Sequence, residues 1–189
     1  TSNSGQMAAG TIELATTTNG GEISGRQVSL GATQNLGGRI GGQTIAIDGS
    51  LYNAALIGAS GQLDVRANTG TGSGSIDNSG QLLGERIALD AQQTHNSGQI
   101  QASDTLSVRG GPLLNGLSEA SRCVADADTC AGRPDAEGNP ARPLTDADRR
   151  WSASPGQIFA GGALDIQVSA LDNQGLIQSG ADARIEASG

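Results

Sequence analysis

One short motif, Asn-x-Gly, returns at nearly constant spacing along this 189-residue chain and constrains the fold more than any other feature. Each in-phase copy precedes an apolar residue and, five or six positions later, an alternating apolar pair such as Ile12 and Leu14. A fixed period of this kind is the signature of a repeat architecture. The in-phase copies start at Asn3, Asn19, Asn35, Asn78, Asn96 and Asn173.

Two further units start at Asn53 and at Ser154 and carry the apolar pattern with a degenerate motif. In the second of them, Ser-Pro-Gly replaces Asn-Ser-Gly. That gives eight units with a basic period of 16–19 residues, one small insertion and one large insertion. A copy at Asn68 is out of phase and opens the small insertion, a Gly/Ser/Thr loop over 68–75. Its glycines superficially resemble a phosphate-binding loop, but no lysine follows and no strand-to-helix junction is expected.

The spacing inside a unit favours strands, because pairs such as Ile45 and Ile47 alternate with period two. Each unit is too short for a strand plus a helix, and glycine between the apolar positions disfavours helices. One such coil cannot bury its own side chains, whereas stacked coils form continuous apolar columns. The sequence therefore predicts an all-β fold, a parallel β-helix of about eight coils, roughly 40 Å long at about 4.8 Å per coil.

The composition fits a narrow core. Leu, Ile, Val and Phe together make up 36 of 189 residues, too few for an ordinary globular core of this length. Asparagine and glycine at the start of each unit suit a left-handed turn conformation. Asparagines stacked from coil to coil also favour an amide ladder along the rod. We expect these asparagines to be structural turn residues.

The net charge of −8 disfavours nucleic acid and anionic membranes as partners. All eleven basic residues are arginine. No apolar stretch approaches the roughly 18 residues that span a bilayer, so membrane insertion is not expected. The first residues lack the features of a signal peptide, and the chain starts inside a repeat, so we interpret it as a segment of a longer protein.

Several units carry a family likeness, among them Asn78-Ser-Gly-Gln-Leu, Asn96-Ser-Gly-Gln-Ile-Gln-Ala and Leu171-Asp-Asn-Gln-Gly-Leu-Ile-Gln-Ser-Gly. Residues 3–109 and 155–189 resemble the filamentous haemagglutinin-type repeats of two-partner secretion exoproteins. That family comprises haemagglutinin adhesins and contact-dependent growth inhibition effectors. The resemblance implies a right-handed β-helical shaft, secretion to the cell surface of a Gram-negative bacterium, and an outer-membrane transporter as the partner of the parent protein.

The expected organisation has coils 1–6 in residues 1–109, an extra-helical insertion in 110–153 and coils 7–8 in 154–189. Because the resemblance implies export through an oxidising periplasm, a disulfide between Cys123 and Cys130 is expected. A metal site would need more ligands, and a reactive thiol pair would more usually be spaced Cys-x-x-Cys. The acidic stretch around these cysteines is expected to be a solvated loop, with a calcium loop as the alternative. Its oxygen-bearing residues are Asp126, Asp128, Asp135, Glu137 and Asn139.

Arg149, Arg150 and Trp151 form the candidate binding surface of the insertion, since an exposed Trp beside Arg is a common interface anchor. Their ligand would be a host or bacterial cell-surface receptor or a glycan. The alternative is that Trp151 packs the insertion onto the shaft. The sole histidine, His95, lies at a variable, outward-facing position, and a catalytic role for it is not expected.

The leading hypothesis is a non-enzymatic shaft segment that projects adhesive or toxin-delivering regions, with no cofactor and no metal. The rival hypothesis is a carbohydrate-active β-helix enzyme, a polysaccharide lyase or hydrolase, which needs clustered carboxylates or a basic catalyst. Outward positions in equivalent coils include Glu13, Asp64 and Asp165, but the coils between them are neutral and no long loops provide the walls of a cleft. An ice-binding helix would require Thr-x-Thr columns, which do not recur in phase.

Overall fold

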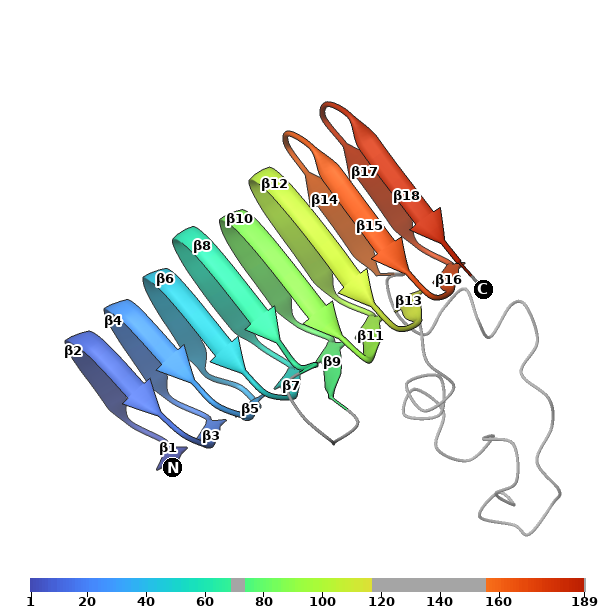
Figure 1. Ribbon diagram of the computed structural model, residues 1–189. Helices are drawn as coiled ribbons and strands as arrows, with labels where there is room; N and C mark the ends of the chain where they lie inside the picture. The colour runs from blue at the N-terminus through green and yellow to red at the C-terminus, as the bar shows by residue number, and fades with distance from the viewer. Residues whose placement is uncertain (69–73, 117–155, 189) are drawn as a thin grey trace, which may run out of the picture.

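Each repeat of the sequence forms one coil of a solenoid. Its apolar residues alternate, and they are buried only when they pack against the inward-facing residues of the coils on either side. The structure is a computed structural model, and it describes residues 1–68, 74–116 and 156–188. Every strand pairing among these residues is parallel. The predicted all-β parallel β-helix of about eight coils is confirmed (Figure 1).

Sheet A contains one short strand from each coil, and all eight end in asparagine. The order in the sheet is β1 (Ser2–Asn3), β3 (Thr17–Asn19), β5 (Thr33–Asn35), β7 (Leu51–Asn53), β9 (Ser75–Asn78), β11 (Gln93–Asn96), β13 (Leu113–Asn115) and β16 (Leu171–Asn173).

Sheet B contains the long strands, which bend in the middle so that their two halves lie on different sides of the rod (Figure 1). The register slips at the bend, between Gly42 and Thr44 in one coil and between Gly84 and Arg86 in another. In the last two coils the bend divides the strand in two. The strands are β2 (Gln6–Leu14), β4 (Glu22–Leu30), β6 (Arg39–Asp48), β8 (Leu56–Arg66), β10 (Gln81–Ala91), β12 (Gln99–Gly110), β14 (Gln157–Ala160) with β15 (Leu164–Val168), and β17 (Leu176–Ser179) with β18 (Ala183–Ala187).

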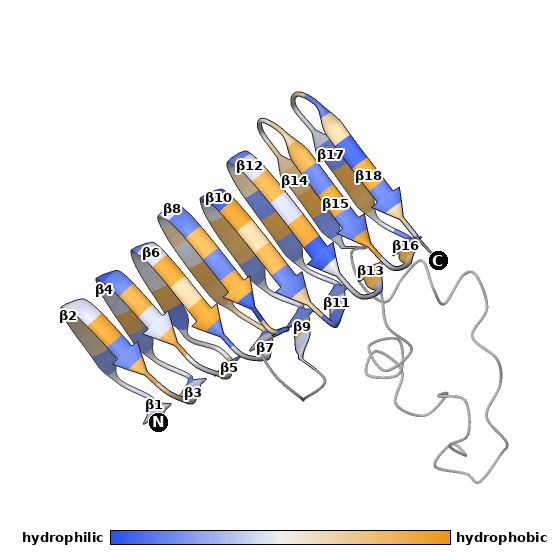
Figure 2. Cartoon of the chain, viewed as in Figure 1, coloured by the Kyte–Doolittle hydropathy of each residue, from blue (hydrophilic) through white to orange (hydrophobic). Residues whose placement is uncertain are grey.

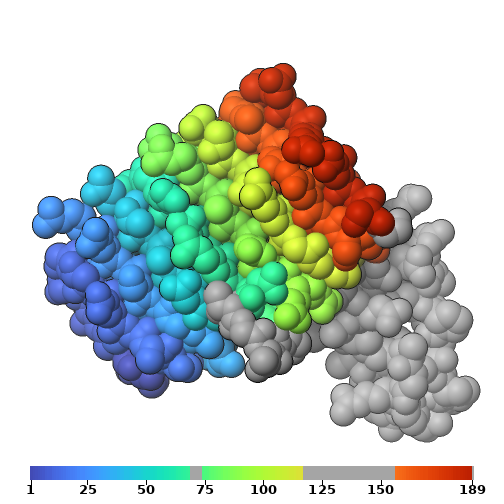
Figure 3. Space-filling model, in the orientation of Figure 1, coloured from blue at the N-terminus to red at the C-terminus, as the bar shows by residue number. Residues whose placement is uncertain are grey.

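The core is a set of apolar columns that run the length of the rod. Register places Ile45, Leu63, Ile87 and Leu106 side by side, and each is at most 2% exposed. The alternating stripes along each strand in Figure 2 are these inward residues and their polar, outward neighbours. Successive coils appear as parallel bands in the space-filling view (Figure 3). A few aliphatic side chains per coil therefore make one continuous core.

Two details differ from the sequence-based expectations. The asparagines are not left-handed turn residues, because among the described residues only Gly49 and Gly110 have a positive φ. The asparagines instead occupy extended, buried strand positions that hold their amides inside the rod. The shaft also continues past residue 109, since β12 ends at Gly110 and β13 pairs with β11 and β16. Within the described residues no helix is long and apolar enough to cross a membrane.

Candidate functional site

The asparagines of sheet A form one uninterrupted ladder of side-chain amides along the rod. The Nδ2 group of each donates to the Oδ1 atom of the next, and all seven of these bonds are 2.8 or 2.9 Å long. The members that lie between two other coils are almost fully buried. In order along the rod they are Asn3, Asn19, Asn35, Asn53, Asn78, Asn96, Asn115 and Asn173.

Each ladder amide also ties the two sheets together. The second Nδ2 hydrogen of Asn53 reaches the carbonyl of Gln81, at the start of the next coil's long strand, at 3.2 Å. The Oδ1 atom of Asn53 accepts from the backbone N–H of Ala55 at 3.3 Å. A buried amide satisfied in this way costs little, whereas an unpaired one costs a full desolvation penalty. The ladder thus fixes both the coil spacing and the turn between the sheets.

Asn115 is a ladder member that the repeat analysis missed. It lies between Asn96 and Asn173 in the stack and takes the asparagine position of the seventh coil. The signal was a second motif, Leu-x-Asn, which Leu113 and Asn115 share with Leu51-Tyr-Asn53 and Leu171-Asp-Asn173.

The large insertion interrupts the turn that follows Asn115. Gly116 precedes it, and Gly156 follows it in the same place relative to the coil as Gly98 and Gly175. The Gln157 N–H donates to the Gly98 carbonyl, and the Leu176 N–H donates to the Gly156 carbonyl. Residues 117–155 lie outside the described part of the chain. They include the cysteines Cys123 and Cys130, the acidic residues of the candidate calcium loop, and the candidate binding residues Arg149, Arg150 and Trp151.

His95 lies beside this turn on the outer surface of sheet A. Its Nε2 atom is 3.0 Å from the carbonyl oxygen of Gly116, and its Nδ1 atom is 3.7 Å from a carboxylate oxygen of Asp77. The hydrogen bond to Asp77, followed by the bond to Gly116, raises the pKa of His95 against the opposing effect of burial. The bond to His95, together with a bond from Ser75, lowers the pKa of Asp77. Both ring nitrogens face acceptors, so the pair favours the imidazolium.

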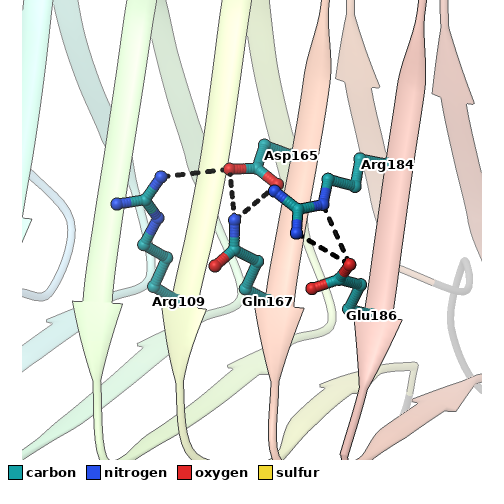
Figure 4. A network of polar contacts seen from close by, with 5 residues as sticks. All are labelled: Arg109, Asp165, Gln167, Arg184 and Glu186. Carbon is teal, nitrogen blue, oxygen red and sulfur yellow. Dashed lines mark hydrogen bonds and ion pairs between the residues drawn. The ribbon is translucent and has the colours of Figure 1, made fainter.

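The second halves of the sheet B strands present a flat outer surface, here called the charged face. Arg109 of β12 donates to Asp165 of β15 at 3.1 Å, and Arg184 of β18 contacts Glu186 at 2.8 Å. Gln167 also donates to Asp165, at 2.9 Å (Figure 4). The bond from Gln167, and then that from Arg109, lowers the pKa of Asp165. Glu186 raises the pKa of the Arg184 guanidinium.

A shallow depression of about 500 Å³ lies on the charged face, although the sequence analysis expected no cleft. Its floor includes Ala88 and Ser107, and its rim includes Asp64 and Asp165 on opposite sides. Continuous register puts these four residues on successive strands, so the two carboxylates are three strand spacings, about 14 Å, apart. The depression forms because small side chains lie between longer ones on the neighbouring strands, and no loop in the described part of the chain forms its walls. Among the described residues no group of three or more His, Cys, Asp or Glu could hold a metal ion.

Comparison with known proteins gives one curated relative. The chain is 32% identical over 147 residues, 76% of its length, to the protein named deoxyribonuclease CdiA of Dickeya dadantii (strain 3937). The chain spans only 4% of the length of that protein. No protein-family model matches the chain. No solved structure matches it either. The chain is thus similar, over about three quarters of its length, to a small part of that protein.

Proposed function

We propose that this chain is an internal shaft segment of a large secreted bacterial exoprotein, a rigid filament that projects adhesive or toxin-delivering regions. The observation that carries the proposal is the asparagine ladder, which continues through all eight coils with bonds of nearly equal length. Such a ladder resists shear between neighbouring coils, because a slip of one coil past the next breaks the hydrogen bond between their asparagine amides.

The family assignment rests on the repeat motifs and on the similarity to a segment of CdiA. We assign the chain to the filamentous haemagglutinin-type repeats of two-partner secretion exoproteins. The parent protein would then be exported by an outer-membrane transporter and displayed at the surface of a Gram-negative bacterium. The nuclease activity in the relative's name belongs, in this proposal, to another part of that much longer protein.

The insertion is proposed to add contacts to the shaft surface. It leaves the rod at a turn, between Gly116 and Gly156, and both sheets continue through the coils on either side of it. Insertions on one face of a solenoid are often binding elements. Arg149, Arg150 and Trp151 would contact a cell-surface receptor or a glycan, and a disulfide between Cys123 and Cys130 would close the acidic loop.

The alternative, a carbohydrate-active enzyme, is supported less well. Asp64 and Asp165 are about 14 Å apart by register, beyond the roughly 5–9.5 Å that glycosidase carboxylate pairs require. A general acid also needs a raised pKa, whereas that of Asp165 is lowered by Gln167. We therefore expect Asp64 and Asp165 not to act as the carboxylate pair of a polysaccharide hydrolase.

Deletion of one whole coil tests the shaft proposal. Removal of residues 78–95 leaves Asn96 to follow Asn53 in the ladder and should shorten the rod by about 4.8 Å without loss of β structure. Small-angle X-ray scattering measures the length, and circular dichroism measures the strand content. A deletion of half a coil is the matched control, because it puts apolar residues on the outer surface and should abolish folding. A folded chain of unchanged length after the full-coil deletion would contradict the proposal.

A second experiment separates a spacer from a recognition element. The loop 117–155 is replaced by a short Gly-Ser loop, which keeps β13 and Asn115 in place. Binding of both proteins to bacterial cells, host cells and a glycan array is then compared. Loss of binding in a folded variant assigns recognition to the insertion. Equal binding by both proteins refutes a binding role for the insertion, and no binding by either limits this segment to a spacer.

A further inference from the structure

The charged face carries its outward side chains in three straight columns, because strands in a parallel stack keep their register. Column one contains Thr11, Gln27, Thr44, Gln62, Arg86 and Thr105. Column two contains Glu13, Ser29, Ala46, Asp64, Ala88, Ser107, Asp165 and Arg184.

Column three alternates in charge across four successive coils, Asp48, Arg66, Asp90 and Arg109. Within the chain the alternation places opposite charges on neighbouring strands, with Arg66 and Asp48 3.9 Å apart. The side chains nevertheless remain open to solvent, since Asp48, Arg66 and Arg109 are 59%, 60% and 57% exposed. Their charge is therefore available to a second molecule.

Consider a two-fold axis that lies in the plane of this face, parallel to the strands and midway between β8 and β10. Rotation about this axis places column three of a second copy over column three of the first, with every acidic residue opposite an arginine. Asp48 then faces Arg109 of the second copy, and Arg66 faces Asp90 of the second copy. Each pairing occurs twice, as in any isologous interface. The two rods lie face to face with their coil orders reversed.

The same operation also matches the other columns. In column two, Glu13 of the first coil faces Arg184 of the last coil of the second copy. Asp64 of the second copy lies over Ala88, on the floor of the depression and beside Arg86. Within the described residues neither Glu13 nor Arg86 makes a hydrogen bond or ion pair. No position on the face meets a like charge.

A parallel arrangement of the two rods does not have this property. Its two-fold axis runs along the stack, so each residue of column two faces its own copy. Glu13, Asp64, Asp165 and Arg184 would each meet an identical charge, and like charges placed directly opposite are destabilising. The charge pattern therefore selects the antiparallel arrangement.

The area of the face suits a modest but specific contact. Eight coils at about 4.8 Å and five residues at about 3.3 Å cover roughly 650 Å² on each copy. The pair would bury roughly 1,300 Å², at the lower end of specific interfaces. Small residues such as Ala46, Ala88 and Ser107 in the central column permit close approach of the two sheets.

We propose that the charged face binds a second copy of this chain, rod against rod and antiparallel, through its self-complementary columns of charge. The inference is independent of the shaft proposal, because it rests on the outer columns alone and not on the asparagine ladder or the insertion. Exposed ion pairs are screened by salt, so the association should weaken as ionic strength rises.

A double-mutant cycle on Glu13 and Arg184 tests the arrangement. The two residues are seven strand spacings apart in one chain, about 34 Å, so they cannot interact within it. Sedimentation equilibrium of the whole chain should show a monomer–dimer equilibrium. We expect Glu13→Arg and Arg184→Glu each to weaken dimerisation by at least about tenfold, because each change removes both symmetry-related contacts, and the double variant to restore it. Arg39→Glu, on the other side of the rod, is the charge-matched control and should change nothing.

A charge-swapped pair of proteins gives a second, independent readout. The variant R66D/R109D makes positions 48, 66, 90 and 109 of column three all acidic, and D48R/D90R makes these four positions all basic. Neither should dimerise alone, and their mixture should form heterodimers. If the like charges unfold either variant, the cycle on Glu13 and Arg184 still decides, because Glu13 has no charged neighbour in its own column. A chain that stays monomeric at low salt, or additive effects in the cycle, would overturn the proposal.

Discussion

Replacement of Asn53 by alanine should break the ladder at its centre and destabilise the whole rod. Asn53 is fully buried and makes two amide–amide bonds, accepting from Asn35 and donating to Asn78, both at 2.8 Å. It also donates to the Gln81 carbonyl. Each such bond contributes about 1 kcal/mol net, and leaving the Asn78 oxygen short of a donor adds to the cost. We expect a loss of about 3 kcal/mol in the free energy of unfolding.

Urea denaturation followed by circular dichroism measures this loss, and thermal unfolding should show a midpoint lower by roughly 6–12 °C for a chain of this size. Asn68→Ala is the matched control, since Asn68 is exposed and its side chain makes a single contact among the described residues, at 3.4 Å to Asp90. It should cost less than about 0.5 kcal/mol. Asn173→Ala should fall between the two, because this exposed residue ends the ladder and makes a single amide–amide bond, which it accepts from Asn115.

Asn53→Asp sharpens the test, because it keeps the shape but removes the N–H donor. An ionised carboxylate would face the Asn78 oxygen and the Gln81 carbonyl, so its pKa in the fold should be raised above the unfolded value. The destabilisation caused by the carboxylate charge is then full at neutral pH, and it disappears as the pH falls below the unfolded pKa of about 3.9. Equal stability of the Asn53→Ala and Asn68→Ala proteins would refute the view that the ladder holds the coils together.

Three further predictions concern the core, a turn and the histidine pair. Ile87→Ala, at a position only 2% exposed, should cost about 2–5 kcal/mol in urea denaturation. Gly110→Ala should destabilise strongly, because Gly110 has φ +116° and an added Cβ would overlap the Ala91 carbonyl oxygen. The NMR pKa of His95 should exceed 6.5, so its stabilising effect is complete below that pH and is lost as the pH rises through the folded value.

Each of these has its own control. Gly37→Ala should be nearly neutral, since no atom lies within 4 Å of the added Cβ. Asp77→Asn should lower the pKa of His95, because the hydrogen bond to Asp77 is the largest cause of its rise. An unshifted His95 in the Asp77→Asn protein would contradict the pairing, and an Ile87→Ala protein as stable as the parent would contradict the core assignment.

The repeat alone was sufficient to predict the fold from the sequence. Alternation in pairs such as Ile45 and Ile47 gives the strands, and the period of 16–19 residues gives the coils. The same period identified the asparagines, because they recur once in each coil. Their conformation was predicted incorrectly, because Asn-x-Gly is usually a turn signal, and burial between coils made the extended form more favourable here. Asn115 was missed because the insertion separates it from its glycine turn.

The candidate surfaces were much harder to foresee. A charge at Asp48 has no visible relation in sequence to one at Arg109, which lies three coils further along the stack. The 25-residue step between Asn53 and Asn78 also hides which residues become neighbours in the stack. The depression likewise arises only when Ala88 and Ser107 lie between Asp64 and Asp165, and a single coil shows no hollow.

The sequence by itself therefore determined the strand pattern, the coil count and the inward residues, because these depend on local alternation and on a repeat that burial requires. Only the tertiary structure decided which outward residues share a column, where the insertion leaves the rod, and how the amides connect. Those features depend on strand register across coils, which is set by packing and hydrogen bonding between segments distant in the chain.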